Sequence, residues 1–376
     1  MEQEKRYIIN PFKIDIAPMK RLLLVNFEKD PDMIYIGFEP QVFEDNIHGK
    51  GHLVIGWRQD GKVDIYHQPS LKLDPEKYDI VGKGLANMVE SELLGASYEV
   101  NDCGVQAYYE FKDINSRNII IKIKENNPKK RKPFGLLAPM GDAAENPSAM
   151  PLVLLHDFYF VRKKHTEIEI NINGKLHKSD ELPLPIDGTN MLFSRYSPKP
   201  LIATLNPAID DEVKPLEVKS KQNQIKCGEY DFELEWINDQ PTIKGITRNN
   251  TIYPITLLFK EAFPSIQALE NNTILKGSFE IEGHPSTGRI GGHYTLEKKN
   301  DIVKIIMIPS KGWAPKSTKF SLLFIYTAAK IFKKWPKTYE WTAHIQEREK
   351  KAYYMQSGWK RINRYTPTTN RDVEKG

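Results

Sequence analysis

The sequence predicts a mostly β protein, with two antiparallel β-barrel or β-sandwich domains and a few short helices. More than a dozen short runs of alternating apolar and polar residues are separated by Gly, Pro, Asn and Asp, which is typical of antiparallel sheets. Few segments carry apolar residues at helical spacing. The regular alternation of strand and helix that a Rossmann or TIM-barrel fold requires does not occur in the sequence.

The first half of the chain predicts a lead-in segment followed by a series of strands. Residues 1–30 are punctuated by Pro11 and Pro18, contain one short strand and precede a first domain expected over residues 31–213. Asp60-Gly61 separates two alternating runs, which is a strong signal for a β-hairpin. Apolar residues at helical spacing before Gly95 predict a helix over residues 84–94. Further strands are expected over residues 96–100, 104–112 and 119–124.

Two unusual segments follow these strands. Residues 126–133 read Asn-Asn-Pro-Lys-Lys-Arg-Lys-Pro. The bounding prolines favour a solvated hairpin tip, and a targeting or phosphate-binding patch is the alternative. Residues 134–149 are rich in Gly, Pro and Ala, and long loops inside compact domains are often lids or binding loops.

The run over residues 150–162 is the segment most suited to carry a site. Both of its faces are apolar at a period of two, which predicts a strand buried on two sides. His156 and Asp157 occupy its middle and are expected to point to opposite faces. Because an unpaired ionisable group in a protein core is costly, each of these side chains needs its own partner.

The second half of the chain predicts a further β domain over residues 214–360. Alternating runs such as residues 229–236 indicate strands, and a short helix is expected over residues 264–269. The spacing of apolar residues predicts one long helix over residues 320–334, which Trp335-Pro336 ends. Residues 361–376 are polar and are expected to form a loosely ordered tail.

The composition excludes several classes of protein. A net charge of +5 over 376 residues is small, so no nucleic-acid partner is expected. The two cysteines, Cys103 and Cys227, are far apart and outside any metal-binding motif. The first residues are charged, unlike a signal peptide, and no run of about 18 apolar residues occurs. We therefore expect a soluble, cytoplasmic protein without an integral membrane segment or a cofactor, and the oligomeric state stays open.

The predicted catalytic residues are Asp157, Tyr159 and His156. Asp157 and Tyr159 share a face of the expected strand, where they would supply a proton and hold a polar group of a ligand. Such a pair suits the acid-assisted hydration or cyclisation of an alkene. A structural hydrogen-bond network in the core is the alternative explanation for these polar side chains.

The predicted ligand-binding residues are Trp57, Arg58, His67, Arg195 and Tyr196. Trp57 and Arg58 suit a cavity mouth, through stacking and ion pairing, although a tryptophan at this position also suits simple packing. Arg195 would bring a guanidinium group to an acidic ligand, or form a plain ion pair at a strand edge. The histidines are scattered singly, so no metal site is expected.

The overall organisation resembles the two-domain lipocalin-like proteins related to hydroxyneurosporene synthase (carotenoid 1,2-hydratase). The resemblance is carried by Gly-His-Leu-Val-Ile-Gly-Trp-Arg at residues 51–58, by residues 291–296 and by residues 335–339. It implies two closed or half-closed antiparallel barrels with a hydrophobic ligand within or between them. Hydration, cyclisation and pure binding all occur among such proteins, so the resemblance fixes no activity and assigns no catalytic residue.

The sequence therefore favours a protein that binds a lipophilic small molecule in a barrel cavity or interdomain groove, and that could convert it without a cofactor. Two other classes stay open. One is a β-sandwich protein that binds or hydrolyses carbohydrate, which predicts an open groove lined by aromatic faces. The other is a structural or interaction protein without a small ligand, which predicts an exposed apolar patch.

Overall fold

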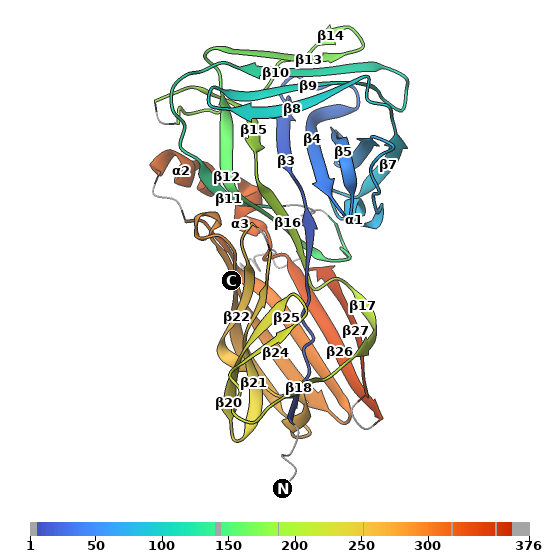
Figure 1. Ribbon diagram of the computed structural model, residues 1–376, viewed down its shortest axis with the longest axis vertical. Helices are drawn as coiled ribbons and strands as arrows, with labels where there is room; N and C mark the ends of the chain where they lie inside the picture. Colours follow the sequence, from blue (N-terminus) through green and yellow to red (C-terminus); the bar gives the residue numbers. More distant parts are fainter. Residues whose placement is uncertain are drawn as a thin grey trace, which may run out of the picture.

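The computed structural model describes residues 6–139, 144–186, 188–250, 252–316, 319–349 and 352–362. The chain forms two β bodies stacked along the long axis of the molecule, which we call the upper and lower bodies (Figure 1). The prediction of a mostly β fold with antiparallel sheets and few helices is confirmed. Of the predicted tail, only Arg361 and Ile362 lie within the described residues.

The upper body is built on a ten-stranded sheet in the order β2-β16-β12-β15-β3-β4-β5-β6-β7, with β11 paired to β12. Its strands are β2 (Ile14–Pro18), β3 (Arg21–Asn26), β4 (Tyr35–Asp45), β5 (Gly49–Arg58), β6 (Val63–His67), β7 (Leu85–Glu90), β11 (Phe134–Ala138), β12 (Met150–Arg162), β15 (Met191–Ser197) and β16 (Pro200–Leu205).

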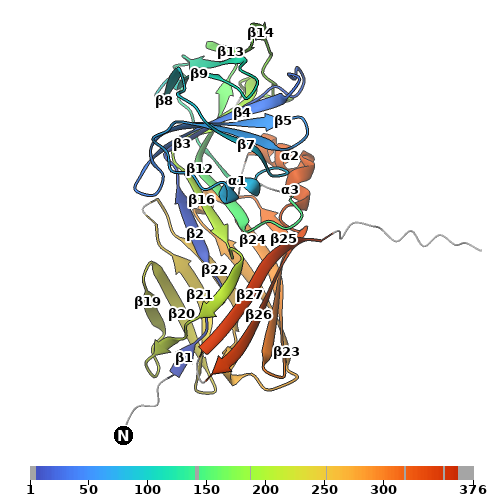
Figure 2. The same cartoon turned by 90° about the vertical axis from the view of Figure 1, so that its right-hand side faces the viewer.

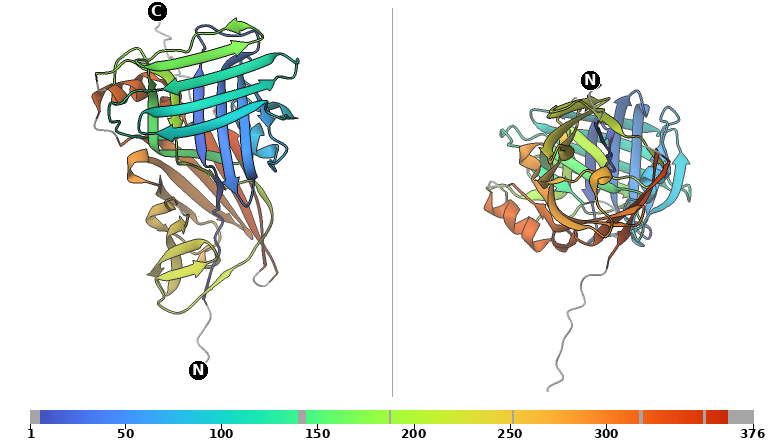
Figure 3. Two further views of the ribbon diagram at one scale, coloured as in Figure 1. Left: turned by 45° about the horizontal axis from the view of Figure 1, so that its top comes forward. Right: turned by 90° about the horizontal axis from the view of Figure 1, so that it is seen from below.

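A five-stranded sheet covers one face of the ten-stranded sheet, and its strands run across those beneath it (Figure 3, left). Its strands are β8 (Gly95–Asn101), β9 (Gly104–Lys112), β10 (Asn118–Glu125), β13 (Thr166–Ile172) and β14 (Lys175–Leu176). Leu23, Val25 and Phe38 pack against Phe111 and Ile121 between the two sheets, and we call this cluster the sandwich core.

The opposite face of the ten-stranded sheet carries a smaller apolar cluster. Leu53, Ile55 and Ile65 form its centre. The short helix α1 (Glu76–Asp79) and its flanking loops cover it, with Leu71 and Val81 as their buried contacts. The sheet therefore has two buried faces at this point, and the second face is turned towards the lower body.

The lower body is a single curled sheet in the order β17-β27-β26-β25-β24-β23-β22-β21-β20-β19 (Figure 3, right). Its strands are β17 (Ile209–Val213), β19 (Gln224–Cys227), β20 (Tyr230–Ile237), β21 (Gln240–Arg248), β22 (Ile255–Phe263), β23 (Ile274–Glu282), β24 (Arg289–Lys299), β25 (Ile302–Ala314), β26 (Tyr339–Glu349) and β27 (Ala352–Arg361). The sheet pairing changes between Leu205 and Ile209, so residues 209–213 belong to the lower sheet.

The lead-in segment connects the two bodies. β1 (Arg6–Ile8) pairs with β18 (Leu216–Val218) beside the lower sheet, and β2 then joins the upper sheet by pairing with β16 (Figure 2). Between them, the Phe12 ring enters the core of the lower body. Its centroid lies 5.2 Å from that of Phe259, 5.0 Å from that of Phe263 and 5.7 Å from that of Trp341.

The predicted helix over residues 84–94 is wrong. Residues 85–90 form β7, which pairs parallel to β6 from Leu85 opposite Val63 to Glu90 opposite His67. Met88 packs on the cluster beneath α1, whereas Val89 packs on the sandwich core. A strand with two apolar faces produces the same spacing of apolar residues as a helix, which explains the error.

The other predicted helices are close to the observed ones. The segment 320–334 is helical but interrupted, with α2 (Phe320–Ala328) and α3 (Lys330–Lys334) separated by Ala329, whose ψ of 111° is extended. A short 3-10 helix, η1 (Ile266–Ala268), lies within the predicted segment 264–269, and a second one, η2 (Pro285–Thr287), precedes β24. Among the described residues, no helix is long and apolar enough to cross a membrane.

Candidate functional site

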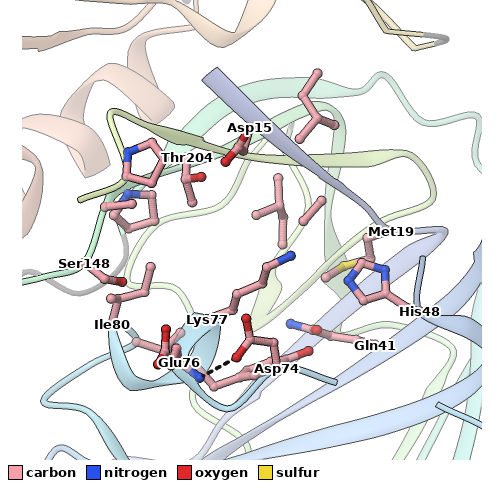
Figure 4. A pocket seen from close by; sticks show the side chains of 18 of the residues that line it. Asp15, Met19, Gln41, His48, Asp74, Glu76, Lys77, Ile80, Ser148 and Thr204 are labelled. Carbon is pink, nitrogen blue, oxygen red and sulfur yellow. Dashed lines mark hydrogen bonds between the residues drawn. The ribbon is translucent and has the colours of Figure 1, made fainter. Parts of the chain in front are cut away.

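A pocket of about 440 Å³ lies where the upper and lower bodies meet, and we call it the junction pocket (Figure 4). Strands β4 and β5 contribute Gln41, Phe43 and Ile55, while β2 and β16 contribute Ala17 and Ile202. Helix α1 and residues 148–151 form other parts of the wall, and Arg248 of β21 belongs to the lower body. The pocket is therefore assembled from segments that are far apart in the sequence.

Side-chain alternation along β4 decides which residues face the pocket. Phe38 and Val42 point into the sandwich core. Gln41 and Phe43 belong to the opposite set of side chains and line the pocket. Glu39 shares their face but lies buried beside Gln41, whose Nε2 atom donates a hydrogen bond of 2.8 Å to Oε1 of Glu39.

The single turn of α1 brings an ammonium group to the pocket. Asp74 precedes the helix, and its Oδ1 atom accepts a hydrogen bond of 3.0 Å from the main-chain N–H of Glu76. The Lys77 side chain extends from this turn towards the centre of the pocket (Figure 4). Within the described part of the chain, no carboxylate forms an ion pair with Lys77.

His48 contributes an oriented imidazole ring to the pocket wall. Its Nδ1 atom lies 3.1 Å from Oδ2 of Asp45, and its ring centroid lies 4.7 Å from that of Phe43. Asp45 is itself held by the main-chain N–H groups of Ile47 and His48, at 2.8 and 2.7 Å from Oδ1. A carboxylate bonded to one ring nitrogen fixes the orientation of the imidazole and leaves the other nitrogen for proton exchange.

A buried charged network lies beside the pocket around Glu39. Trp57 Nε1 donates a hydrogen bond of 3.1 Å to Oε2 of Glu39. Burial raises the pKa of Glu39 to about 6, although the hydrogen bonds from Gln41 and Trp57 and the charge of Arg195 oppose this shift. Burial also lowers the pKa of Arg195 to about 10, and Glu39 and Glu28 counteract that change. The carboxyl group of Glu39 therefore changes its charge close to neutral pH.

Two of the predicted ligand-binding residues meet in this network. Trp57 contacts Glu39 directly, and Arg195 acts on Glu39 through its charge, while its Nη1 atom donates a 2.8 Å hydrogen bond to Oδ1 of Asn26. The sequence predicted that both residues bind a ligand, but it did not identify Glu39 as their common neighbour. Neither of the two side chains lines the junction pocket itself.

Arg58 and His67 lie elsewhere. Arg58 forms ion pairs with Asp60 and Asp64, at 3.1 Å each, and so it helps to neutralise a carboxylate at the edge of the sandwich core. His67 is buried, and its Nδ1 atom lies 3.1 Å from the main-chain oxygen of Gln68. Neither side chain lines the junction pocket.

The structure brings His156 and Asp157 together, against the expectation that they point to opposite faces. His156 Nε2 lies 3.5 Å from Asp157 Oδ2. The register of β11 against β12 shifts here, and the partner of β12 changes from β16 to β15 between residues 155 and 159. A bulge of this kind breaks the alternation of side chains.

The surroundings of His156 belong to the contact between the two bodies. Its ring centroid lies 5.1 Å from those of Tyr253 and His284, which both come from loops of the lower body. Burial lowers the pKa of His156, while the Asp157 carboxylate and the main chain of Lys199 oppose this effect. Tyr253 also donates a 3.0 Å hydrogen bond to the main-chain oxygen of Leu154.

Tyr159 and Tyr196 form a separate group. They face each other across β12 and β15, and their rings stack with centroids 5.3 Å apart. The Arg131 guanidinium lies over both rings, 4.9 Å from the centroid of Tyr159 and 5.4 Å from that of Tyr196. Of the predicted catalytic residues, His156 and its neighbour Asp157 therefore lie at the contact with the lower body, whereas Tyr159 lies in this aromatic stack.

Comparison with protein-family models, with curated proteins and with solved structures finds no match.

The described residues contain no group of three or more His, Cys, Asp or Glu side chains placed to hold a metal ion. His67, His156 and His293 lie on three different strands, β6, β12 and β24. The His293 Nδ1 atom is 2.5 Å from Oγ of Ser310.

The sequence did not predict Gln41, His48 and Lys77 as lining residues of the junction pocket, or Glu39 as a buried group beside it. Glu39 and Gln41 are two residues apart in a strand, so their sharing a face could have been inferred from the sequence. His48 and Lys77 gave no comparable signal. His48 lies in the turn between β4 and β5, and Lys77 lies in a single helical turn, so neither belongs to a periodic pattern.

Proposed function

We propose that the protein binds an amphipathic small molecule in the junction pocket. The observation that supports this most directly is the direction of Lys77, whose ammonium group extends into a pocket with largely apolar walls (Figure 4). Pockets of 300–1,000 Å³ with mostly apolar walls and a few polar groups are typical of small-molecule sites. The volume of about 440 Å³ lies within this range.

The distribution of groups in the pocket favours a ligand with an apolar body and a strongly polar end. Ala17, Met19, Phe43, Ile55 and Ile202 supply apolar contacts. Lys77 and Arg248 supply positive charges, and Asp15, Asp74 and Glu76 supply carboxyl groups, so the polar end would meet groups of both signs of charge. This proposal keeps the lipophilic ligand and the interdomain groove expected from the sequence, and it adds a strongly polar group at one end.

The aromatic surface that a carbohydrate groove presents is missing from the lining. Among the described lining residues, the aromatic side chains are those of Phe43, His48 and Tyr78, and no tryptophan is present. Sugars bind preferentially against flat, exposed aromatic faces. The carbohydrate hypothesis therefore receives less support from this pocket than the amphipathic ligand does.

A second candidate function is a cofactor-free proton transfer to or from the bound molecule. The observation that favours it is the His48–Asp45 pair, since an imidazole oriented by a carboxylate is a common general acid–base arrangement. Hydration or cyclisation of an alkene would need such a group at the pocket wall. In this proposal His48 takes the role that the sequence assigned to Asp157, Tyr159 and His156.

The binding proposal is tested with the fluorescent probe 1-anilinonaphthalene-8-sulfonate, which joins apolar rings to an anionic group. Ala17→Phe should fill the pocket and weaken probe binding at least about tenfold, the equivalent of about 1.4 kcal/mol. Ala314→Phe makes the same change at an exposed position outside the pocket and should leave binding unchanged. Equal binding by all three proteins would contradict the proposal.

The second candidate is tested by solvent extraction of the purified protein followed by mass spectrometry. A conversion by His48 predicts that wild-type protein carries the product, whereas His48→Gln carries the unreacted precursor. A hydration would appear as a mass difference of one water molecule. The same extracted compound from both proteins would leave binding supported and refute proton transfer by His48.

A further inference from the structure

A second pocket, far from the first along β12, has a strongly basic lining. It has a volume of about 290 Å³ and is lined by side chains from four parts of the chain. We call it the basic pocket, and its basic lining residues are Lys129, Lys130, Arg131, Lys132, Arg162 and Lys319. No Asp or Glu is among its described lining residues.

The run Lys129–Lys132 is not the hairpin tip expected from the sequence. Strand β10 pairs with β9 and β13, whereas β11 pairs with β12, so residues 126–133 cross from the five-stranded sheet to the ten-stranded sheet. The crossing brings this run against Arg162 near the end of β12. Basic residues that are separated in sequence therefore surround one pocket.

Arg162 forms the buried floor of the basic pocket. It is 2% exposed, and its Nε atom lies 3.2 Å from Oε1 of Glu125. Its Nη1 atom donates to Oδ1 of Asn127 at 2.8 Å and to the main-chain oxygen of Lys129 at 2.6 Å. Its Nη2 atom is buried and has no hydrogen-bond partner among the described residues. A guanidinium that is buried with an unused donor is an energetically costly arrangement unless an acceptor completes it.

The charges around this floor do not balance. Among the residues that the structure describes, Glu125 is the one buried carboxylate that contacts both guanidinium groups, at 3.2 Å for Arg162 and 3.5 Å for Arg131. Lys130 and Lys132 add two exposed ammonium groups at the pocket. No ion pair joins either of these lysines to a carboxylate within the described ranges of the chain. An excess of positive charge around a partly enclosed space favours an anion.

One wall of the basic pocket is apolar. Phe134, Phe160 and Met191 line it together with the Tyr159 ring. The volume is several times the approximately 30 Å³ that one water molecule occupies in the liquid, so it can hold an anionic group together with part of an organic group. Arginine and lysine side chains that converge in this way are typical of phosphate recognition.

We propose that the basic pocket binds the phosphate group of an organic phosphate, with its organic part against Phe134 and Phe160. The phosphate oxygens accept hydrogen bonds from Arg162 at the floor and from Lys130 and Lys132 at the entrance. This site is separate from the junction pocket and does not depend on the function proposed for it. The same chemistry is offered by a soluble phosphate compound and by the headgroup of a phospholipid.

The first test measures binding of inorganic pyrophosphate by calorimetry at low ionic strength. The double variant Lys130→Glu/Lys132→Glu changes exposed residues and should weaken binding at least about tenfold. The control Lys226→Glu/Lys276→Glu makes the same change in net charge at exposed positions of β19 and β23. The control should bind pyrophosphate like the wild-type protein.

The second test distinguishes the sources of the phosphate. Sedimentation with phosphatidylcholine vesicles, with and without phosphatidic acid, measures binding to a lipid headgroup. Pyrophosphate binding that is lost in the pocket variant alone supports a soluble ligand, and loss of phosphatidic-acid binding in that variant alone supports a headgroup. No binding of either probe by the wild-type protein, or equal loss in pocket and control variants, would overturn the proposal.

Discussion

Trp57 Nε1 donates a hydrogen bond of 3.1 Å to Oε2 of Glu39, so an indole group holds one end of a carboxyl group buried beneath the junction pocket. Gln41 holds the other oxygen. Burial nevertheless dominates and raises the pKa of Glu39 to about 6, from an ordinary value of 4.5. The protein thus contains a carboxyl group whose charged form is disfavoured by folding.

The sign of the resulting pH dependence follows from this shift. Between pH 4.5 and about 6 the folded protein binds more protons at Glu39 than the unfolded chain does. The contribution of Glu39 to stability is therefore fully present below pH 4.5 and is lost as the pH rises through about 6. The loss amounts to about 2 kcal/mol, because one pKa unit corresponds to about 1.4 kcal/mol.

Glu39→Gln should raise the melting temperature at pH 7.5 and leave it nearly unchanged at pH 4. The amide still accepts the hydrogen bond from Trp57. A rotation of the Gln41 amide turns its buried and unpartnered Oε1 atom towards the new donor. Thermal unfolding followed by circular dichroism at both pH values measures the difference. If the substitution instead lowers the melting temperature at pH 7.5 more than it does at pH 4, Glu39 is stabilised in its charged form.

Asp157→Asn should lower the pKa of His156 further, because the Asp157 carboxylate opposes the effect of burial on this ring. The charges of His284 and Lys199 already act in the lowering direction. NMR titration of the imidazole resonances, assigned with His156→Gln, measures the change. An unchanged pKa would show that the 3.5 Å contact between His156 and Asp157 is not formed in solution.

The same pair contributes to the response of the protein to acid, in the direction opposite to that of Glu39. Because the pKa of His156 is lowered by folding, the folded state binds fewer protons at this ring than the unfolded state does, and the contribution of His156 to stability falls as the pH drops below 6.5. Asp157→Asn should make this loss steeper, whereas the exposed control Asp301→Asn should not. Urea unfolding between pH 7 and pH 5 gives the comparison.

Phe12→Ala should destabilise the protein by about 3–5 kcal/mol, since its ring is 3% exposed and packs against Phe259, Phe263 and Trp341. Phe320→Ala is the matched control, because Phe320 is 83% exposed and should change stability by less than about 0.5 kcal/mol. Urea denaturation provides both values. Equal effects for the two substitutions would contradict the insertion of Phe12 into the lower body.

Gly135→Ala should destabilise the contact between the upper and lower bodies. A Cβ atom at residue 135 of β11 would overlap the main-chain oxygen of Ser286 in η2. Overpacking against a main chain costs about 1–3 kcal/mol or more. Gly358→Ala, where a Cβ atom meets no other atom within 4 Å, should be tolerated. Similar melting temperatures for the two variants would argue against close packing of β11 on η2.

Much of the fold could be predicted because alternation is a local property of the chain. The two-sided strand over residues 150–162 is observed as β12, and the hairpin at Asp60-Gly61 is observed between β5 and β6. The helix predicted over residues 84–94 failed because Met88 and Val89 face different apolar clusters. Local spacing cannot distinguish such a strand from a helix.

The sites were harder to predict because pairing between distant segments creates them. The junction pocket depends on β2 lying beside β16, with Ala17 opposite Ile202, and the sequence contains no sign of that register. The basic pocket depends on the crossing of residues 126–133 between sheets, which places Lys130 near Arg162. The bulge that joins His156 to Asp157 likewise arises from tertiary pairing, since β12 exchanges partners at this point.

The insertion of Phe12 into the lower body also constrains the order of events during translation. More than two hundred residues separate Phe12 from its partners on β22 and β26. The ribosome therefore makes Phe12 long before it makes these partners. The nascent upper body must therefore emerge with an apolar segment that lacks its partners until β22 has been made. Contacts between residues so far apart in sequence slow folding and prolong the exposure of aggregation-prone apolar surface. This protein is thus expected to depend on chaperones more strongly than two independently folding domains of the same size would.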